Sequence, residues 1–187
     1  PYSCCRWIHS AFGQVVWHGL FSVALNGWIG KVEVYTFERA LRLNNYPSPN
    51  TLESAQYSIP FCLAVAALEK KEALLSMESE MLGRSDLVAF AQNVELYIDP
   101  VLDKLFPGCT PARVNLKTKR GSFQKLIENP LGDTSNPLVL EKLKAKFSHL
   151  AQGYVSSRKQ QEMMEAILSI EEGDLKQLFH LLQQQEA

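Results

Sequence analysis

Four short segments with a two-residue hydrophobic period most strongly constrain the fold of this 187-residue chain. They cover residues 31–37, 94–99, 113–118 and 122–128. Alternation of apolar and polar side chains is typical of strands with one buried face. The last two segments flank Lys119-Arg120-Gly121, which is a good hairpin signal. Helical patterns occur before, between and after the strands without regular alternation, so the sequence predicts an α+β fold with a sheet of about four strands.

A proline lies inside the clearest helical pattern of the first half. After a polar, proline-containing loop, apolar side chains at helical spacing predict a helix as far as Lys71, with Asn50 or Thr51 as its cap. Pro60 would remove one amide donor from this helix. Either a new helix starts near Pro60, where proline is tolerated, or the helix kinks beside Tyr57. The sequence leaves both alternatives open.

Helical spacing also predicts a first helix at 6–25 and a short helix at 87–92, with Ser85 or Asp86 as the cap of the latter. Beyond residue 136 the pattern becomes helical throughout. We therefore expect an α+β domain at 1–136, followed by carboxy-terminal helices at 137–187.

The charge balance excludes a general attraction to nucleic acid or anionic lipid. The chain has 19 Lys and Arg against 20 Asp and Glu, a formal net charge of -1. Lys117, Lys119, Arg120 and Lys125 form a local basic cluster, which a solvated hairpin tip explains. No apolar run approaches the ~18 residues that a membrane span needs. We expect neither nucleic acid nor membrane as a partner.

The four cysteines, Cys4, Cys5, Cys62 and Cys109, show no disulfide pattern. In a chain of this length they are typical of free thiols in a reducing compartment. We therefore expect a cytoplasmic protein, or a mitochondrial one in a eukaryote. Cys5 and His9 have the spacing of two zinc ligands, but a tetrahedral site needs three or four protein ligands. The sequence predicts no metal site.

Reactive side chains concentrate in the first nine residues, PYSCCRWIH. One helical turn would bring Cys5, Arg6 and His9 to the same place. Arg grips carboxylates, and His or Cys can move a proton near neutral pH. The alternative is an ordinary helix start with a buried Cys and a capping Arg, which the spacing alone favours. Because the chain opens with Pro1 inside this motif, we expect it to be a piece of a longer polypeptide.

The order of several motifs resembles the MmgE/PrpD family, which includes 2-methylcitrate dehydratase, cis-aconitate decarboxylase and iminodisuccinate epimerase. The motifs are PYSCCRWIH, KVEVYTF, LESAQYSIPFCLAVAAL, VELYID, NPLGDTSNPL and LEKLKAKF. AQYSIPFxxAVA at 55–66 and GDxxNPL at 132–138 carry the resemblance best. The sequence departs from the family pattern at Ser3, where proline is usual, and at residues 12–28. The resemblance implies the carboxy-terminal portion of such an enzyme, whose final helices return to an amino-terminal helical domain outside this chain.

The resemblance also implies an active site between the two domains that handles small di- or tricarboxylates without metal or organic cofactor. Tyr57 corresponds to a tyrosine that faces the substrate in decarboxylase-like members, and Cys5 falls where some members carry an active-site His. His9 matches a frequent His of the first motif. The catalytic candidates are Tyr57, Cys5 and His9, and the substrate-binding candidates are Arg6, Cys4 and Gln56.

The implied function is that of a lyase or isomerase that dehydrates, decarboxylates or epimerises a small carboxylic acid, as a homodimer. Such reactions begin with a proton or a carbanion next to a carboxylate. Tyr57 could donate a proton, Arg6 could anchor a carboxylate, and His9 could relay a proton or hold the loop. The alternative is a non-catalytic truncated paralogue or interaction domain that keeps only the scaffold.

Overall fold

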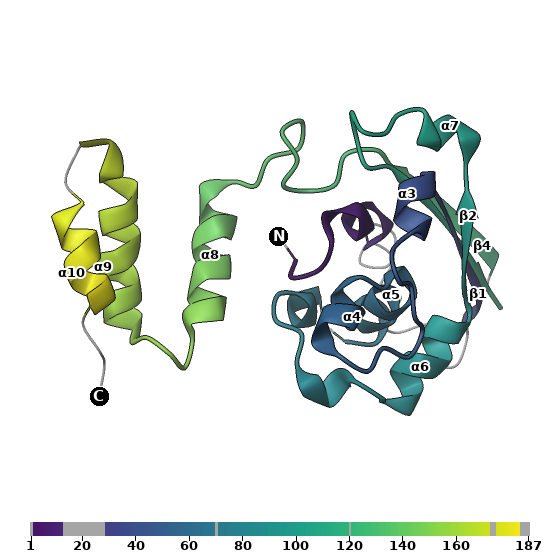
Figure 1. Cartoon of the computed structure of the whole chain (residues 1–187), viewed down its shortest axis with the longest axis horizontal. Helices are drawn as coiled ribbons and strands as arrows, with labels where there is room; N and C mark the ends of the chain where they lie inside the picture. Colours follow the sequence, from purple (N-terminus) through teal and green to yellow (C-terminus); the bar gives the residue numbers. More distant parts are fainter. Residues whose placement is uncertain (1, 13–28, 70, 120, 173–174, 184–187) are drawn as a thin grey trace. The chain divides into compact units, whose positions relative to one another are not determined.

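The computed structural model describes residues 2–12, 29–69, 71–119, 121–172 and 175–183. The chain divides into two compact units, Pro1–Pro137 and Leu138–Ala187 (Figure 1). Within the described residues, no helix combines the length and the apolar character that crossing a membrane requires.

The first unit is built on a four-stranded mixed sheet with the strand order β2-β1-β3-β4. The strands are β1 (Ile29–Thr36), β2 (Val94–Ile98), β3 (Ala112–Thr118) and β4 (Gly121–Ile127). β1 pairs parallel with β2 and antiparallel with β3, and β3 and β4 form the predicted hairpin. Together with the flanking helices, this sheet confirms the predicted α+β class.

The strand faces follow the alternation in the sequence. Val32, Val34 and Thr36 are buried on the inner face of β1. Val114 and Leu116 lie opposite Val34 and Val32 on β3 and are buried as well. Because the side-chain period of a strand is two, the remaining positions of β1 point away from this core.

Short helices cover the inner face of the sheet (Figure 1). α5 (Ile59–Leu68) is the most buried of them, with nine of its ten residues buried. It packs against α6 (Ser85–Gln92), η1 (Arg6–Ala11) and η2 (Lys71–Leu74). The other helical segments of this unit are α3 (Glu38–Leu41), α4 (Leu52–Gln56), η3 (Ser79–Met81) and α7 (Pro100–Asp103).

The structure decides between the two alternatives for Pro60. α4 ends at Gln56 and a separate helix, α5, begins at Ile59, which confirms the alternative of a new helix near Pro60. α5 ends at Leu68, three residues before the predicted end at Lys71. Ser58 caps α5 by accepting a hydrogen bond from the Phe61 amide at 3.2 Å. Pro60 therefore lies in the first turn, where its missing amide hydrogen costs no helical hydrogen bond.

The predicted helix caps are correct in part. Thr51, and not Asn50, caps α4 by accepting from the Ser54 amide at 3.1 Å. α6 begins at Ser85 and follows Arg84, so neither of the two predicted caps holds its amino end. Of the predicted helix at 6–25, η1 forms the first part as a 3₁₀ helix, and residues 13–28 lie outside the described part of the chain.

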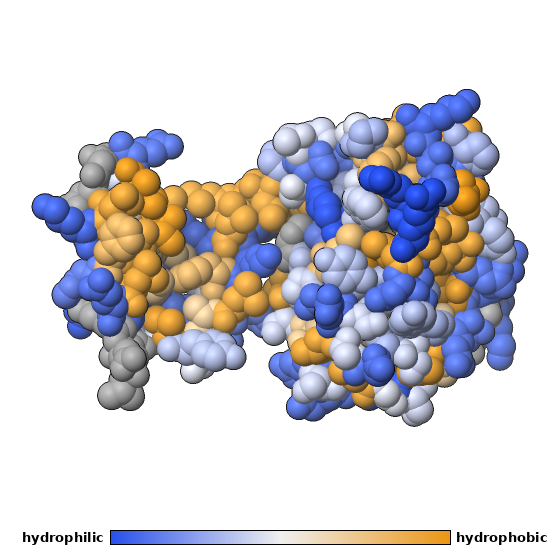
Figure 2. Space-filling view, viewed as in Figure 1, coloured by the Kyte–Doolittle hydropathy of each residue, from blue (hydrophilic) through white to orange (hydrophobic). Residues whose placement is uncertain are grey.

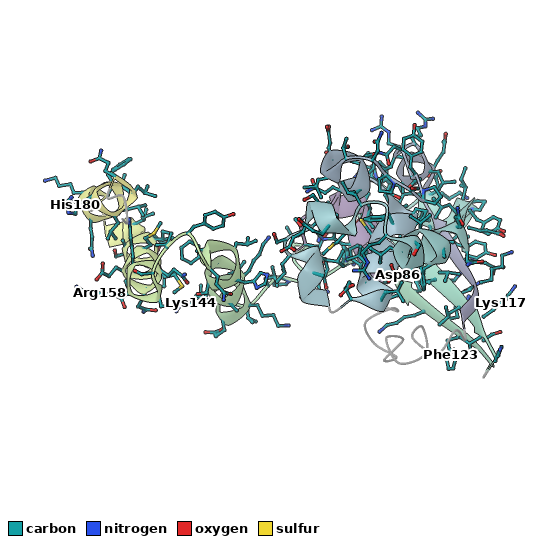
Figure 3. The ribbon with its side chains drawn as sticks, turned by 90° about the horizontal axis from the view of Figure 1, so that it is seen from below. Asp86, Lys117, Phe123, Lys144, Arg158 and His180 are labelled. Atoms are coloured by element: carbon teal, nitrogen blue, oxygen red, sulfur yellow. The ribbon has the colours of Figure 1, made fainter. Side chains whose placement is uncertain are left out.

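Three residues of the predicted basic cluster, Lys117, Lys119 and Lys125, lie on the hairpin of β3 and β4. Lys117 and Phe123 lie on β3 and β4, toward the turn (Figure 3). Lys117 is exposed, and its ammonium group pairs with Glu33 at 2.9 Å. Arg120 lies outside the described residues.

The second unit contains α8 (Leu140–Ala151), α9 (Ser157–Leu168), η4 (Ile170–Glu172) and α10 (Lys176–Gln183). Apolar side chains gather on its surface (Figure 2). Those at least 37% exposed include Leu140, Leu143, Leu150, Tyr154, Ile167, Leu168, Leu175, Phe179 and Leu182. Exposed apolar surface of this extent is typical of an interaction site.

Candidate functional site

The candidate residues come together where the start of the chain passes the break between α4 and α5. The Cys5 amide donates a hydrogen bond to the Gln56 carbonyl at 2.9 Å, although the two residues are far apart in sequence. Two residues before Cys5, the Ser3 amide and hydroxyl both donate to the Leu74 carbonyl, at 2.8 and 3.0 Å. These contacts fix the turn at Cys4 and Cys5 beside Gln56 and Tyr57.

Tyr57 lies at the carboxy end of α4 and leaves 44% of its surface exposed. The loop before α4 holds its backbone, because the Asn45 amide donates to the Tyr57 carbonyl at 3.3 Å. The side-chain oxygen of Asn45 in turn accepts from the Ile59 amide at 3.0 Å. The short break is thus fixed on both sides, and the side chain of Tyr57 is exposed.

Arg6 uses both terminal nitrogens to hold the loop that follows β4. Nη2 donates to the Asp133 carboxylate at 3.0 Å and to the Pro130 carbonyl at 3.3 Å. Nη1 donates to the Leu131 carbonyl at 2.9 Å and contacts Nδ1 of His9 at 3.1 Å. The guanidinium is therefore already paired with a carboxylate of this chain, which a substrate carboxylate would have to replace or share.

His9 is only 7% exposed, so it does not face bulk solvent. Nε2 lies 3.2 Å from the Cys4 carbonyl, and Nδ1 faces Arg6. Tyr2 and Phe12 pack against the ring, with centroids 5.2 and 6.0 Å away. The buried ring of His9 thus contacts the backbone of the turn at Cys4 and Cys5.

A family model described as the MmgE/PrpD C-terminal domain matches residues 2–172, which is most of the chain. The chain belongs to the MmgE/PrpD family. The match includes all six candidate residues, and it continues beyond Pro137 into the second unit. No curated protein matches the chain significantly.

In this MmgE/PrpD chain, three of the four thiols lie near one another. Burial is the main cause that raises the pKa of Cys5, and the neighbouring Cys4 adds to the shift. Burial, followed by a hydrogen bond with Cys4, raises the pKa of Cys62 well above its ordinary value. Cys5 and Cys62 are therefore protonated thiols at neutral pH, which donate hydrogen bonds weakly and are poor nucleophiles.

All four cysteines are free. Within the described part of the chain, no group of three or more His, Cys, Asp or Glu is arranged to hold a metal ion. The hydroxyl of Tyr57 and the thiol of Cys5 can both donate hydrogen bonds, and they belong to segments that contacts of His9 and Gln56 hold together.

Reasoning from the sequence missed three residues that shape this site. Asp133 binds Arg6, while Asn45 and Ser58 fix the backbone around Tyr57. A signal existed for Asp133, because it belongs to the GDxxNPL motif that carried the resemblance. Asn45 adopts a positive φ of 48°, which a turn-forming Asn tolerates, so the polar loop contained a usable signal for it as well.

Proposed function

We propose that this chain is the carboxy-terminal part of a cofactor-independent lyase or isomerase that acts on small di- or tricarboxylic acids. The hydrogen bond from Cys5 to Gln56 is the observation that best supports this function, since it places Tyr57 beside the first motif of an MmgE/PrpD domain. The reaction would be a dehydration, a decarboxylation or an epimerisation at a carbon next to a carboxylate.

In the proposed reaction, Tyr57 donates a proton or a hydrogen bond to the substrate. A half-exposed phenol can do this without first breaking a buried contact. Cys5 supports it as a protonated thiol, since burial keeps its pKa high. The base that removes the substrate proton and the cations that bind its carboxylates would come from the helical domain that the family resemblance implies.

The second unit supports the proposal of a missing helical domain. Its helices leave large apolar side chains exposed, among them Leu143, Phe179 and Leu182. Surface of this kind is normally covered by another domain or subunit. We propose that it packs on the helical domain of the parent chain, and the homodimer remains a prediction.

The experiment is to assay the parent enzyme on a panel of carboxylic acids that includes 2-methylcitrate and cis-aconitate. Exchange of substrate protons with deuterated water would detect carbanion chemistry even without net turnover. We expect Tyr57→Phe to lower kcat by about 10²-fold or more, since it removes only the acidic hydroxyl.

Tyr46→Phe is the matched control, because this phenol is also exposed, at 59%, and lies on the neighbouring loop. It should retain full activity. Unchanged turnover in Tyr57→Phe would exclude the proton-donor role. A parent enzyme that neither converts nor exchanges any acid of the panel would refute the proposed function and favour a non-catalytic domain.

A further inference from the structure

The contacts of Arg6 connect three side chains and one carbonyl in a single row. Asp133 Oδ2 lies 3.0 Å from Arg6 Nη2, and Arg6 Nη1 lies 3.1 Å from His9 Nδ1. His9 Nε2 then lies 3.2 Å from the Cys4 carbonyl oxygen. The row thus runs from the loop after β4, through η1, to the turn that carries Cys5.

The chemistry of the two ends determines where the protons lie. A guanidinium group has only donors, so Nδ1 of His9 must accept. A carbonyl oxygen has only acceptor capacity, so Nε2 must carry the proton and donate it. Both contacts therefore require the same species, a neutral imidazole with its hydrogen on Nε2.

The carboxylate at the start of the row is itself oriented. Its second oxygen, Oδ1, accepts from the hydroxyls of Thr134 and Ser135, at 3.3 and 3.4 Å. The hydrogen bond from Arg6 is the largest of the effects that lower the pKa of Asp133. Asp133 is therefore ionised at neutral pH and presents a fixed charge to Arg6.

We propose that Asp133 is a positioning residue of the site, which orients Arg6 so that His9 is kept in the Nε2–H tautomer and holds the Cys4 carbonyl. This inference rests on the proposed function for its effect on catalysis. The sequence left open whether His9 relays a proton or holds the loop, and the proposal assigns it the second role. His9 holds the turn, and Cys5 and Tyr57 face the substrate.

Replacement of Asp133 by Asn preserves the shape and removes the charge. Pro130 and Leu131 still accept hydrogen bonds from Arg6 through their carbonyls, so the loop remains attached. The guanidinium loses its charged partner. The neutral amide oxygen of Asn can accept from Nη2 only in a weaker hydrogen bond, so the donor from Nη1 to Nδ1 is oriented less firmly. If Asp133 only attached the loop to Arg6, the contacts with Pro130 and Leu131 would replace it, and the tautomer of His9 would not change.

The first measurement is the ¹⁵N NMR spectrum of histidine-labelled protein at neutral pH, with the His9 signals assigned by a His9→Gln variant. The wild-type chain should show Nδ1 as the unprotonated nitrogen and Nε2 as the protonated one. Asp133→Asn should shift both signals toward the averaged values of mixed tautomers. Arg6→Lys should do the same, because an ammonium group lacks the fork that bridges two partners.

Asp86→Asn is the matched control. Asp86 forms another Asp–Arg pair, with Arg84 at 2.6 Å, on α6 (Figure 3). This variant should leave the His9 signals as in the wild type. A wild-type His9 with its proton on Nδ1, or His9 signals unaffected in both Asp133→Asn and Arg6→Lys, would overturn the proposal.

The second measurement is kcat and KM of the parent enzyme. We expect Asp133→Asn to lower kcat about 10-fold or more with a smaller change in KM, since a displaced turn misaligns the reacting groups. An altered His9 spectrum with unchanged kcat would overturn the positioning role. The NMR measurement needs no turnover, so an inactive parent enzyme would refute the proposed function while the spectra still decide the tautomer.

Discussion

Replacement of Ser58 by alanine tests how the break that positions Tyr57 is held. Ser58 is fully buried, and its hydroxyl makes two hydrogen bonds. It donates to the Tyr46 carbonyl at 2.7 Å and accepts from the Phe61 amide at 3.2 Å. The first contact ties the preceding loop to the break, and the second caps α5.

The magnitude follows from these two contacts. Loss of a serine cap costs about 1 kcal/mol of folding free energy. Leaving the partly buried Tyr46 carbonyl without its donor costs at least about 1 kcal/mol more. Ser58→Ala should therefore destabilise the first unit by about 2 kcal/mol, which corresponds to a fall in Tm of roughly 4–8 °C for a chain of this size.

Urea unfolding followed by tryptophan fluorescence measures this effect. All three tryptophans of the sequence lie before residue 137, and Trp7 packs against Phe37 and Phe106, so its fluorescence reports on the first unit. Ser85→Ala is the control, since Ser85 is exposed at the first residue of α6 and should change the free energy of unfolding by less than about 0.5 kcal/mol. If Ser58→Ala unfolds at the same urea concentration as the wild type, the account of the break is wrong.

Two further predictions concern titration and thiol access. A hydrogen bond from Lys117 is the main cause that lowers the pKa of Glu33 in the folded protein. The ionised Glu33 therefore stabilises the fold above its pKa in the unfolded chain, about 4.3, and this stabilisation is lost as the pH falls through its lower pKa in the folded protein. Glu33→Gln should therefore lose less stability than the wild type between about pH 5 and pH 3. If the urea midpoints of the two proteins fall by the same amount over this range, the stabilising role of ionised Glu33 is refuted. Cys62 is fully buried, with a raised pKa, so iodoacetamide should modify it only after unfolding, whereas partly exposed Cys4 reacts in the native state. Mass spectrometry of the peptides checks this order, and equal rates for Cys4 and Cys62 would refute it.

The sheet could be predicted because each strand carries its own signal. The alternation of Val32, Val34 and Thr36 placed β1 and its buried face correctly, and the Lys-Arg-Gly turn placed the hairpin. The sequence predicted an irregularity near Pro60 but not its form, since proline is compatible with a kink or with a helix start. The buried hydroxyl of Ser58 decides for the helix start, and burial is a property of the whole fold.

The candidate site was harder to predict because its decisive contacts are not local. The spacing of Cys5, Arg6 and His9 placed them within one turn, and the family resemblance added Tyr57. Nothing in the first nine residues indicates that Arg6 binds Asp133, which lies 127 positions away. The spacing therefore favoured a substrate anchor or a cap for Arg6, whereas the fold commits both of its terminal nitrogens to a loop of the same chain.

The pairing of Arg6 has a consequence for how a carboxylic acid could bind. A di- or tricarboxylate brings at least two negative charges, and moving them out of water requires compensating cations. Asp133 already neutralises Arg6, so an acid that displaced this carboxylate would leave Asp133 uncompensated. The proposed substrates therefore need cations from outside this turn, and the implied helical domain is where the proposed function places them. On this reasoning, Arg6→Lys should act mainly on kcat through the turn at Cys5, and a large rise in KM with unchanged kcat would instead identify Arg6 as the substrate anchor.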